Sequence, residues 1–293
     1  MHSVLGDKKT IAILLGPALL VYTLIMMVPV AWSFVLTFFS GNPLQGFTLA
    51  GLSNYARIFD DPYIGDAFWF TVKYAVLVSL GQVVLGYGLA LTYYFLLRRS
   101  SALVRTLVFF PVVLPTVAIS LLYQKLFQSA PNDGLVNELL VNVGLGGVDW
   151  LGAGNTAFVV VVLMDVWRSM GFYAVLIFSG LLDIPVDIIE SARLDGARFV
   201  GMLRHIVLPM SLPILFASMI FSINGTIKVF DSVFALTGGG PGSSTTPLTL
   251  YMYRTAFQYS DYGYGSTIAL LLTIMCLLIT LVIFRSSRRD NTV

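Results

Sequence analysis

The heptapeptide ESARLDG, residues 190–196, is a charged link between two strongly apolar runs, and IVLP follows it at residues 206–209. Pro185 predicts the beginning of a helix here, because a proline at the first helical position gives up no useful N–H. Gly196 predicts the end of that helix, since glycine adopts the left-handed C-cap conformation most easily. We expect a second short helix, from 197 to about 207, to leave at an angle. Helices of about a dozen residues are marginal in water, so the first one is expected to pack against another surface.

The spacing of this stretch resembles the EAA loop of the membrane-spanning subunits of bacterial ABC importers. The usual form of that loop is Glu-Ala-Ala, three residues, Gly, nine residues and Ile-x-Leu-Pro, and Ser191 in place of the second alanine is the one departure here. The resemblance implies a cytoplasmic coupling helix seated in a groove of a separate ATPase. An ordinary helical hairpin between membrane spans is the alternative. The implied ATPase-coupling residues are Glu190, Ser191, Ala192, Arg193, Asp195 and Gly196.

Composition indicates what surrounds this loop. The chain has 293 residues, of which 57% are hydrophobic and 11% are charged, and its mean hydropathy is +0.86. These values exclude a soluble domain of this length and predict a polytopic membrane protein. The net charge of +2 does not suggest a nucleic-acid partner, and a single cysteine, Cys276, cannot form an internal disulfide.

Long apolar runs predict an all-α protein with six transmembrane helices in one domain, residues 1–293. Each run is long enough to cross about 30 Å of hydrocarbon. The third run contains Pro111 and Pro115, which membrane helices tolerate when neighbouring groups satisfy the freed carbonyls. Residues 183–210 form the predicted cytoplasmic loop. The expected spans are about 11–39, 67–97, 106–127, 156–182, 211–236 and 266–284.

Basic residues select the orientation of these spans. Only Arg57 and Arg254 lie clearly in the loops opposite the termini. Eleven of the 17 lysines and arginines fall on the side that holds the termini and the Glu190 loop: Lys8, Lys9, Arg98, Arg99, Arg105, Arg193, Arg198, Arg204, Arg285, Arg288 and Arg289. The positive-inside rule therefore predicts that both termini and the Glu190 loop are cytoplasmic.

No constellation for catalysis or metal binding stands out. The two histidines, His2 and His205, have no partners at metal-ligand spacing, so no metal site is predicted. The glycine-rich turn at 237–242 lacks the lysine of a phosphate-binding loop, so no ATPase site is predicted in this chain. An intramembrane enzyme is the weak competing interpretation.

Three further stretches are similar to the sugar-importer permeases of the maltose and glycerol-3-phosphate type. They are GLSNY at 51–55, LTGGGPG at 236–242 and YMYRTAF at 251–257, and the second is closer to the MalF-like or UgpA-like member of the permease pair. Phe70-Thr71 departs from the Asn-Thr common in these families. The resemblance implies a type I importer permease fold in the inner membrane of a bacterium or archaeon. It also implies a second permease, an ATPase dimer carrying ATP and Mg, an extracytoplasmic solute-binding protein, and no cofactor in this chain.

Polar residues inside the predicted spans are the candidates for a transport site, because charge at the bilayer centre is costly. Asp165 and Arg168 are three residues apart and could pair. Asn224, Lys228 and Asp231 are expected to share one helical face, with Lys228 and Asp231 mainly in an internal pair or at a subunit interface. Another helical face carries Ser222, Gly225, Thr226 and Val229, and it predicts either close helix packing or the wall of a polar passage.

Resemblance to the maltose permease favours the passage. Its sugar-contacting positions would fall at Arg168, Ser169, Phe172, Ser222, Gly225, Thr226 and Val229. Arg168 departs from that family, and a guanidinium can fork onto sugar hydroxyls or a phosphate. The predicted function is a permease subunit for a sugar, oligosaccharide or polyol, and a polyol like glycerol-3-phosphate is among the candidate substrates. The alternatives are an ion-coupled secondary transporter that uses Asp165, Lys228 and Asp231, and a structural membrane scaffold.

Overall fold

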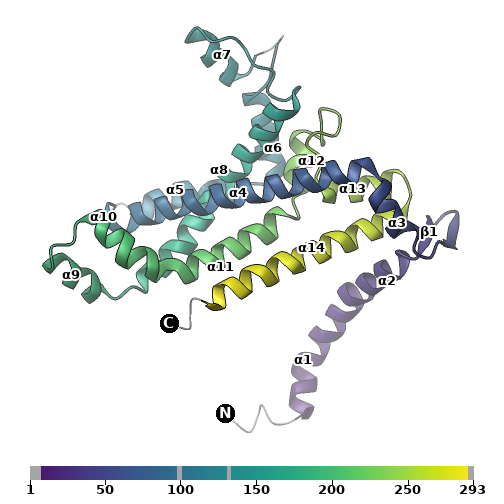
Figure 1. Cartoon of the computed structure of the whole chain (residues 1–293), viewed down its shortest axis with the longest axis horizontal. Coiled ribbons are helices and arrows are strands. Elements are labelled where there is room, and N and C mark those ends of the chain that lie inside the picture. Colours follow the sequence, from purple (N-terminus) through teal and green to yellow (C-terminus); the bar gives the residue numbers. More distant parts are fainter. Residues whose placement is uncertain (1–7, 98–100, 131–132, 290–293) are drawn as a thin grey trace. The chain divides into compact units, whose positions relative to one another are not determined.

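The computed structural model describes residues 8–97, 101–130 and 133–289. Most of its secondary-structure elements are helices (Figure 1). The chain divides into two compact units, the first of residues 1–62 with 252–271 and the second of residues 63–251 with 272–293. The last long helix, α14 (Tyr262–Arg289), begins in the first unit and ends in the second.

Membrane-crossing helices are confirmed by length and composition. The described residues contain five helices that are long and apolar enough to cross a bilayer, and a bent pair, Ser101–Val113 with Thr116–Leu126, makes a sixth if it is counted as one span. The five are Lys9–Leu36, Pro62–Phe95, Gly154–Leu182, Phe199–Thr226 and Tyr262–Ile283.

The third predicted span, 106–127, is not one straight helix. It consists of α5 (Ser101–Val113) and α6 (Thr116–Leu126), which meet at an angle of 95°. Pro115 explains the break, because it has no N–H to donate and its ring disfavours helical geometry at Leu114. Pro111 lies inside α5 without ending it.

The fifth predicted span, 211–236, also differs. Helix α11 (Leu208–Thr226) ends before residue 231, and a separate short helix, α12 (Asp231–Leu236), follows. Upstream, the second short helix of the loop was expected over 197–207. The structure instead joins this segment to α11, because Phe199–Thr226 forms one continuous helix. It begins with α10 (Phe199–Met202) and passes through a π-helical turn, η2 (Leu203–Val207). The wider turn precedes Pro209, whose missing N–H would otherwise leave a gap in an α-helical ladder.

Three helices build the core of the second unit: α4 (Pro62–Phe95), α8 (Gly154–Leu182) and α11. Tyr93, Ile177 and Leu181 are buried among them, and Ile189 from the loop helix α9 (Val186–Leu194) joins the same cluster. Helix α5 packs on α8, where a Cβ at Gly171 would overlap the carbonyl oxygen of Val108. The remaining elements of this unit are α7 (Leu135–Asn142) and most of α13 (Leu248–Tyr253).

In the first unit, the predicted span 11–39 ends early. It consists of α1 (Lys8–Tyr22), a π-helical turn, η1 (Thr23–Met27), and α2 (Val28–Leu36). An antiparallel hairpin follows, which is a short addition to the predicted helical architecture. Strand β1 (Phe39–Asn42) pairs with β2 (Gly46–Leu49) in the register Phe39↔Leu49 and Asn42↔Gly46. Asn42 accepts the N–H groups of Leu44 and Gln45, which folds the turn.

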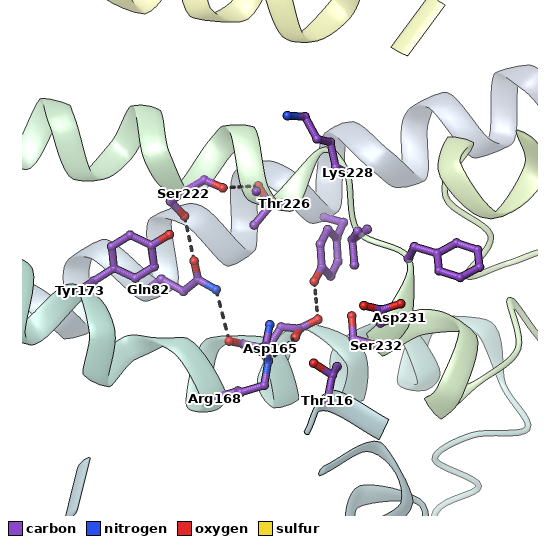
Figure 2. A pocket seen from close by; sticks show the side chains of 14 residues that line it. Gln82, Thr116, Asp165, Arg168, Tyr173, Ser222, Thr226, Lys228, Asp231 and Ser232 are labelled. Atoms are coloured by element: carbon purple, nitrogen blue, oxygen red, sulfur yellow. Dashed lines mark hydrogen bonds and ion pairs between the residues drawn. The ribbon is translucent and has the colours of Figure 1, made fainter. Parts of the chain in front are cut away.

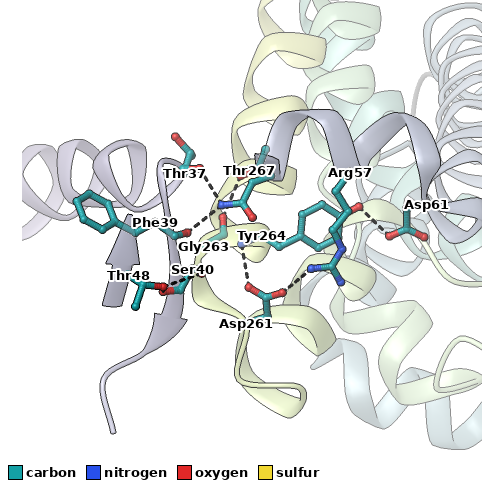
Figure 3. A network of polar contacts seen from close by, with 11 residues as sticks. Thr37, Phe39, Ser40, Thr48, Arg57, Asp61, Asp261, Gly263, Tyr264 and Thr267 are labelled. Carbon is teal, nitrogen blue, oxygen red and sulfur yellow. Dashed lines mark hydrogen bonds and ion pairs between the residues drawn. The ribbon is translucent and has the colours of Figure 1, made fainter. Parts of the chain in front are cut away.

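The GLSNY stretch fixes the hairpin by hydrogen bonding. Buried Asn54, in α3 (Ser53–Asp60), donates to the carbonyls of Thr37 and Phe39 at 2.9 and 2.8 Å. Figure 3 shows the adjoining contacts. The unit also contains the π-helical turn η3 (Arg254–Gln258).

An ion pair extends this network. Arg57 lies 2.7 Å from Asp261 and over the ring of Tyr264 at 3.9 Å, while the Tyr264 hydroxyl donates to Asp61 at 2.7 Å (Figure 3). Arg57, which the sequence distinguishes only as one of two arginines in the loops opposite the termini, therefore has a structural role.

Candidate functional site

A polar cavity of about 230 Å³ lies inside the second unit. Side chains from α4, α6, α8, α11 and α12 surround it, together with the segment between α11 and α12 (Figure 2). The lining residues carry hydroxyl, amide, carboxylate, guanidinium and aromatic groups. They are Tyr74, Gln82, Thr116, Asp165, Arg168, Tyr173, Ser222, Gly225, Thr226, Lys228, Val229, Phe230, Asp231 and Ser232.

Interrupted helices meet at this cavity. Thr116 is the first residue of α6, just after the 95° bend, and residues 227–230 form the break between α11 and α12. Non-helical backbone at membrane depth is tolerated where it is buried in protein or lines a cavity, because its polar groups need partners. Here the carbonyl of Val229 accepts a hydrogen bond from the Thr249 hydroxyl. Broken helices at the bilayer midplane are typical of transport sites.

A side-chain amide ties α6 to α12 next to the cavity. The Nε2 of Gln124 donates to the carbonyls of Ala235 and Leu236 at 2.9 and 2.8 Å. These carbonyls belong to the end of α12, where a short helix leaves its last acceptors unpaired. The two short helices therefore lie side by side, as Figure 1 shows.

Asp165 is the most deeply buried charge at the site, with 2% of the residue exposed. One carboxylate oxygen accepts a hydrogen bond from the Tyr74 hydroxyl, and the other lies 3.2 Å from the Nε of Arg168. The predicted pairing of Asp165 with Arg168 is therefore confirmed. Buried charges are stable only when they are paired and hydrogen-bonded, and both conditions are met here.

Arg168 retains donors for a ligand. Its side chain is 27% exposed, and only Nε is used by Asp165. The two terminal nitrogens have no hydrogen-bond partner among the described residues, and a guanidinium has five N–H donors in a planar fork. The side chain lines the cavity (Figure 2), so those donors are available to a bound molecule.

Gln82 connects three helices. It accepts a hydrogen bond from Ser222 of α11 at 2.8 Å and donates to the backbone carbonyl of Asp165 in α8 at 3.2 Å (Figure 2). One turn away, the hydroxyls of Ser79 and Thr226 bond to each other at 3.1 Å. The small polar face of α11 thus serves both predicted purposes, because it packs against α4 and also lines the cavity.

The predicted substrate-contacting residues divide into two groups. Ser169 and Phe172 do not line the cavity, and Phe172 instead stacks on Phe221, with the ring centroids 5.8 Å apart. The others all line it: Arg168, Ser222, Gly225, Thr226 and Val229.

Several lining residues were not singled out by sequence. Tyr74 and Gln82 are polar groups within an otherwise apolar span, which is the signal that could have indicated them. Thr116, Phe230 and Ser232 carry no comparable sequence signal, because their position depends on where the helices break. Tyr173 lies within the unbroken helix α8, where the sequence does not distinguish it from the other aromatic residues of that span.

Lys228 and Asp231 line the cavity without pairing. Both residues are exposed, and the described residues contain no ion pair between them. The expected shared helical face of Asn224, Lys228 and Asp231 is wrong, because α11 ends at Thr226 and Asp231 belongs to α12. In Figure 2 the ammonium group of Lys228 points away from the other labelled side chains.

The loop at 183–210 forms the predicted short helix. Helix α9 begins after Pro185 and ends in a Schellman motif, in which Ala197 N–H bonds to the carbonyl of Ala192 at 2.9 Å and Gly196 N–H bonds to that of Arg193 at 3.1 Å. Gly196 has φ = +80°, as predicted for its C-cap role.

Helix α9 is held by one face only. Ile189 and Ala192 are buried, whereas Glu190, Ser191 and Asp195 are exposed. A surface hollow of about 360 Å³ lies on this loop and is lined by Asp187, Ile188, Ser191, Ala192, Asp195 and Ile206. The exposed face is therefore free to meet another surface.

Comparison with known proteins gives consistent matches over most of the chain. The family model for the binding-protein-dependent transport system inner membrane component matches residues 82–289. The sulfoquinovosyl glycerol transport system permease protein SmoG of Agrobacterium fabrum is 32% identical over 98% of this chain and 93% of its own. The trehalose/maltose transport system permease protein MalF of Thermococcus litoralis is 30% identical over 96% of this chain and 95% of its own.

A solved structure has the same fold. A chain in the crystal structure of a bacterial ABC transporter involved in the import of the acidic polysaccharide alginate superimposes with a TM-score of 0.86. The match covers 98% of each chain at 21% sequence identity.

Proposed function

The chain belongs to the family of binding-protein-dependent transport system inner membrane components, and from this premise we propose that it is the permease subunit of an ATP-driven importer for a sugar, oligosaccharide or related polyol. The polar cavity where the interrupted helices meet carries the proposal. A cavity of hydroxyl, amide and guanidinium groups with aromatic neighbours matches the alternating polar and apolar surfaces of a carbohydrate.

Relatives support this substrate class. SmoG is named for sulfoquinovosyl glycerol, and MalF of T. litoralis for trehalose and maltose. In the present chain, Arg168, Gln82 and Ser222 would donate to or accept from ligand hydroxyls, while Tyr173 would provide an aromatic face. A phosphorylated polyol would use the free nitrogens of Arg168.

The exposed face of α9 supports the proposed coupling. We place Glu190, Ser191, Arg193 and Asp195 against a cytoplasmic ATPase dimer. In this proposal the dimer binds Mg and ATP and hydrolyses the ATP, and the present chain has no ATPase activity of its own. The complex would also contain a second permease and an extracytoplasmic solute-binding protein. ATP-driven closure of the dimer would rock the permeases between inward-open and outward-open states, because the ATPase contacts of α9 differ between those states.

The orientation follows from charge. The termini and the α9 loop lie on the cytoplasmic side in this proposal, as the distribution of arginines and lysines favours. Helix α9 packs through the buried side chain of Ile189 against the hydrophobic core of the second unit, and this core extends to the cavity.

Uptake assays test the proposal directly. The purified complex in proteoliposomes should take up a labelled sugar only with its binding protein outside and ATP inside, and uptake should survive an ionophore. Uptake that needs no ATP and collapses with the ionophore would instead support ion-coupled secondary transport, with Asp165, Lys228 and Asp231 as the coupling residues.

A further inference from the structure

A third hollow of the second unit lies on helix α5, with a different chemistry from the polar cavity. It is a groove of about 480 Å³ in which one face of α5 meets Val175 of α8. Its lining includes Arg105, Thr106, Phe109, Phe110, Val113 and Val175. The α5 members recur at helical spacing, so they form one continuous stripe.

Arg105 is the single ionisable side chain among the described residues that line this groove. Its Nε donates to the carbonyl of Ser101 at 3.2 Å, and its guanidinium carbon lies 4.6 Å from the centre of the Phe178 ring. These contacts hold the half-buried side chain in place. The terminal nitrogens have no hydrogen-bond partner among the described residues, so a fixed cation with free donors stands at one end of an apolar groove.

The charged end of the groove is the end near the α9 loop. Phe178 lies one turn before the end of α8 at Leu182, and α5 begins at Ser101, two residues after Arg99 in the sequence. From Arg105 the apolar stripe runs toward the bend between α5 and α6, which is deeper along the span. This polarity, with a cation at the interface and an apolar groove leading inward, matches a phospholipid.

The groove does not suit another transmembrane helix. Helix interfaces in membranes are rich in small residues that permit close backbone approach. Such an approach occurs elsewhere on α8, where Gly171 admits the backbone of α5 at Val108. The groove instead presents Phe109, Phe110 and Val113, with exposed fractions of 59% for Phe110 and 70% for Val113.

We propose that this groove binds an anionic phospholipid, with the phosphate on Arg105 and one acyl chain along Phe109 and Val113. Assignment of the lipid to the cytoplasmic leaflet rests on the orientation proposed above. The binding itself does not depend on transport, so it is tested without a substrate.

Native mass spectrometry of the detergent-purified complex, with its co-purifying subunits, measures the binding. The probes are phosphatidylglycerol and phosphatidylcholine with identical acyl chains, added after delipidation. We expect one phosphatidylglycerol to be retained per permease in preference to phosphatidylcholine. Arg105→Ala should weaken phosphatidylglycerol retention about fivefold, because one arginine contributes about that factor to binding at an anionic lipid surface. Arg105→Lys should keep the preference, and Val175→Trp, which fills the groove, should abolish it.

Arg204→Ala is the matched control, because Arg204 is an exposed arginine of the loop side that lies outside the groove. It should bind phosphatidylglycerol like the unmodified complex. Equal retention of both lipids, or unchanged retention in folded Arg105→Ala complex, would overturn the proposal. So would a photo-crosslinking residue at Phe110 that captures a protein subunit in native membranes and no lipid.

Discussion

The buried carboxylate of Asp165 contacts both Tyr74 and Arg168 at the cavity. Each of its oxygens has a partner, one the Tyr74 hydroxyl and the other Arg168, and the residue is only 2% exposed, so little of the carboxylate is accessible to a ligand. We therefore interpret it as a positioning residue that fixes the guanidinium at the cavity wall. In the proposed importer, the ligand meets Arg168 and is affected by Asp165 only through it.

Replacing this carboxylate tests that role. Asp165→Asn should raise the KM for transport about tenfold, the effect of losing roughly 1.4 kcal/mol of orientation and charge pairing, with a smaller change in maximal rate. Asp231→Asn is the control, because Asp231 is an exposed carboxylate of the same cavity with no ion pair among the described residues. Equal KM values for the two variants would show that Asp165 does not position Arg168.

Gly196 allows a test of backbone conformation alone. A Cβ at this position would meet nothing within 4 Å, so the cost of Gly196→Ala comes from φ = +80° and should be about 1 kcal/mol. The strain would loosen the Schellman end of α9, and we expect less uptake per ATP hydrolysed. Gly201→Ala in α10 is the control, because its Cβ also meets nothing and no positive φ is present. If both variants retain full coupling, the C-cap has no part in transmission.

At the scale of elements, the sequence predicted the helices better than their breaks. Pro185 and Gly196 limit α9 through local geometry, so its bounds followed from the sequence. The break after Thr226 has no such signal, because Ile227-Lys228-Val229-Phe230 contains neither glycine nor proline. It is stabilised by Thr249, twenty residues along the chain, and no local pattern contains that contact.

The candidate site was also predictable only in part from the sequence. The α11 face with Ser222 and Thr226 followed from helical periodicity and resemblance, and the structure places both residues at the cavity. Gln82 was missed because its importance lies in connecting α4 to α8 and α11, a tertiary arrangement. The hairpin after residue 36 was missed for a related reason, since its first strand is held by hydrogen bonds from the side chain of Asn54, fifteen residues after Phe39.

The contact between α6 and α12 leads to a prediction about these broken helices. Gln124→Leu removes two hydrogen bonds and leaves the carbonyls of Ala235 and Leu236 without that donor, a cost of about 1–3 kcal/mol. The complex should melt at a lower temperature and its transport KM should rise, because α12 carries Ser232 at the cavity. Gln128→Leu is the control, since among the residues that the structure describes its side chain accepts a hydrogen bond from exposed Lys125 alone. Identical melting of both variants would contradict a structural role for this tie.

The whole molecule combines an intramembrane cavity with a loop helix that is only half covered. Hydrophobic composition determined the class of protein, and charge asymmetry determined the proposed orientation. Composition contains no information on how the cavity and the loop are connected. In the structure, Ile189 of α9 belongs to the same buried cluster as Tyr173, and Tyr173 lines the cavity. A displacement of α9 therefore has a packed route to the site through contiguous side chains.

Glu190→Ala tests that connection in the assembled complex. Glu190 is exposed, while its neighbours Ile189 and Ala192 hold α9 in place. The substitution should therefore leave membrane insertion unchanged and alter the free energy of unfolding by no more than about 0.5 kcal/mol. Uptake should fall at least tenfold, whereas the ATPase subunits should continue to hydrolyse ATP without stimulation by the loaded binding protein. The control is Glu138→Ala, because Glu138 is also exposed and lies on the eight-residue helix α7. Full uptake by the Glu190 variant, with normal stimulation, would show that α9 does not transmit the ATPase motion and would require another contact surface for the motor.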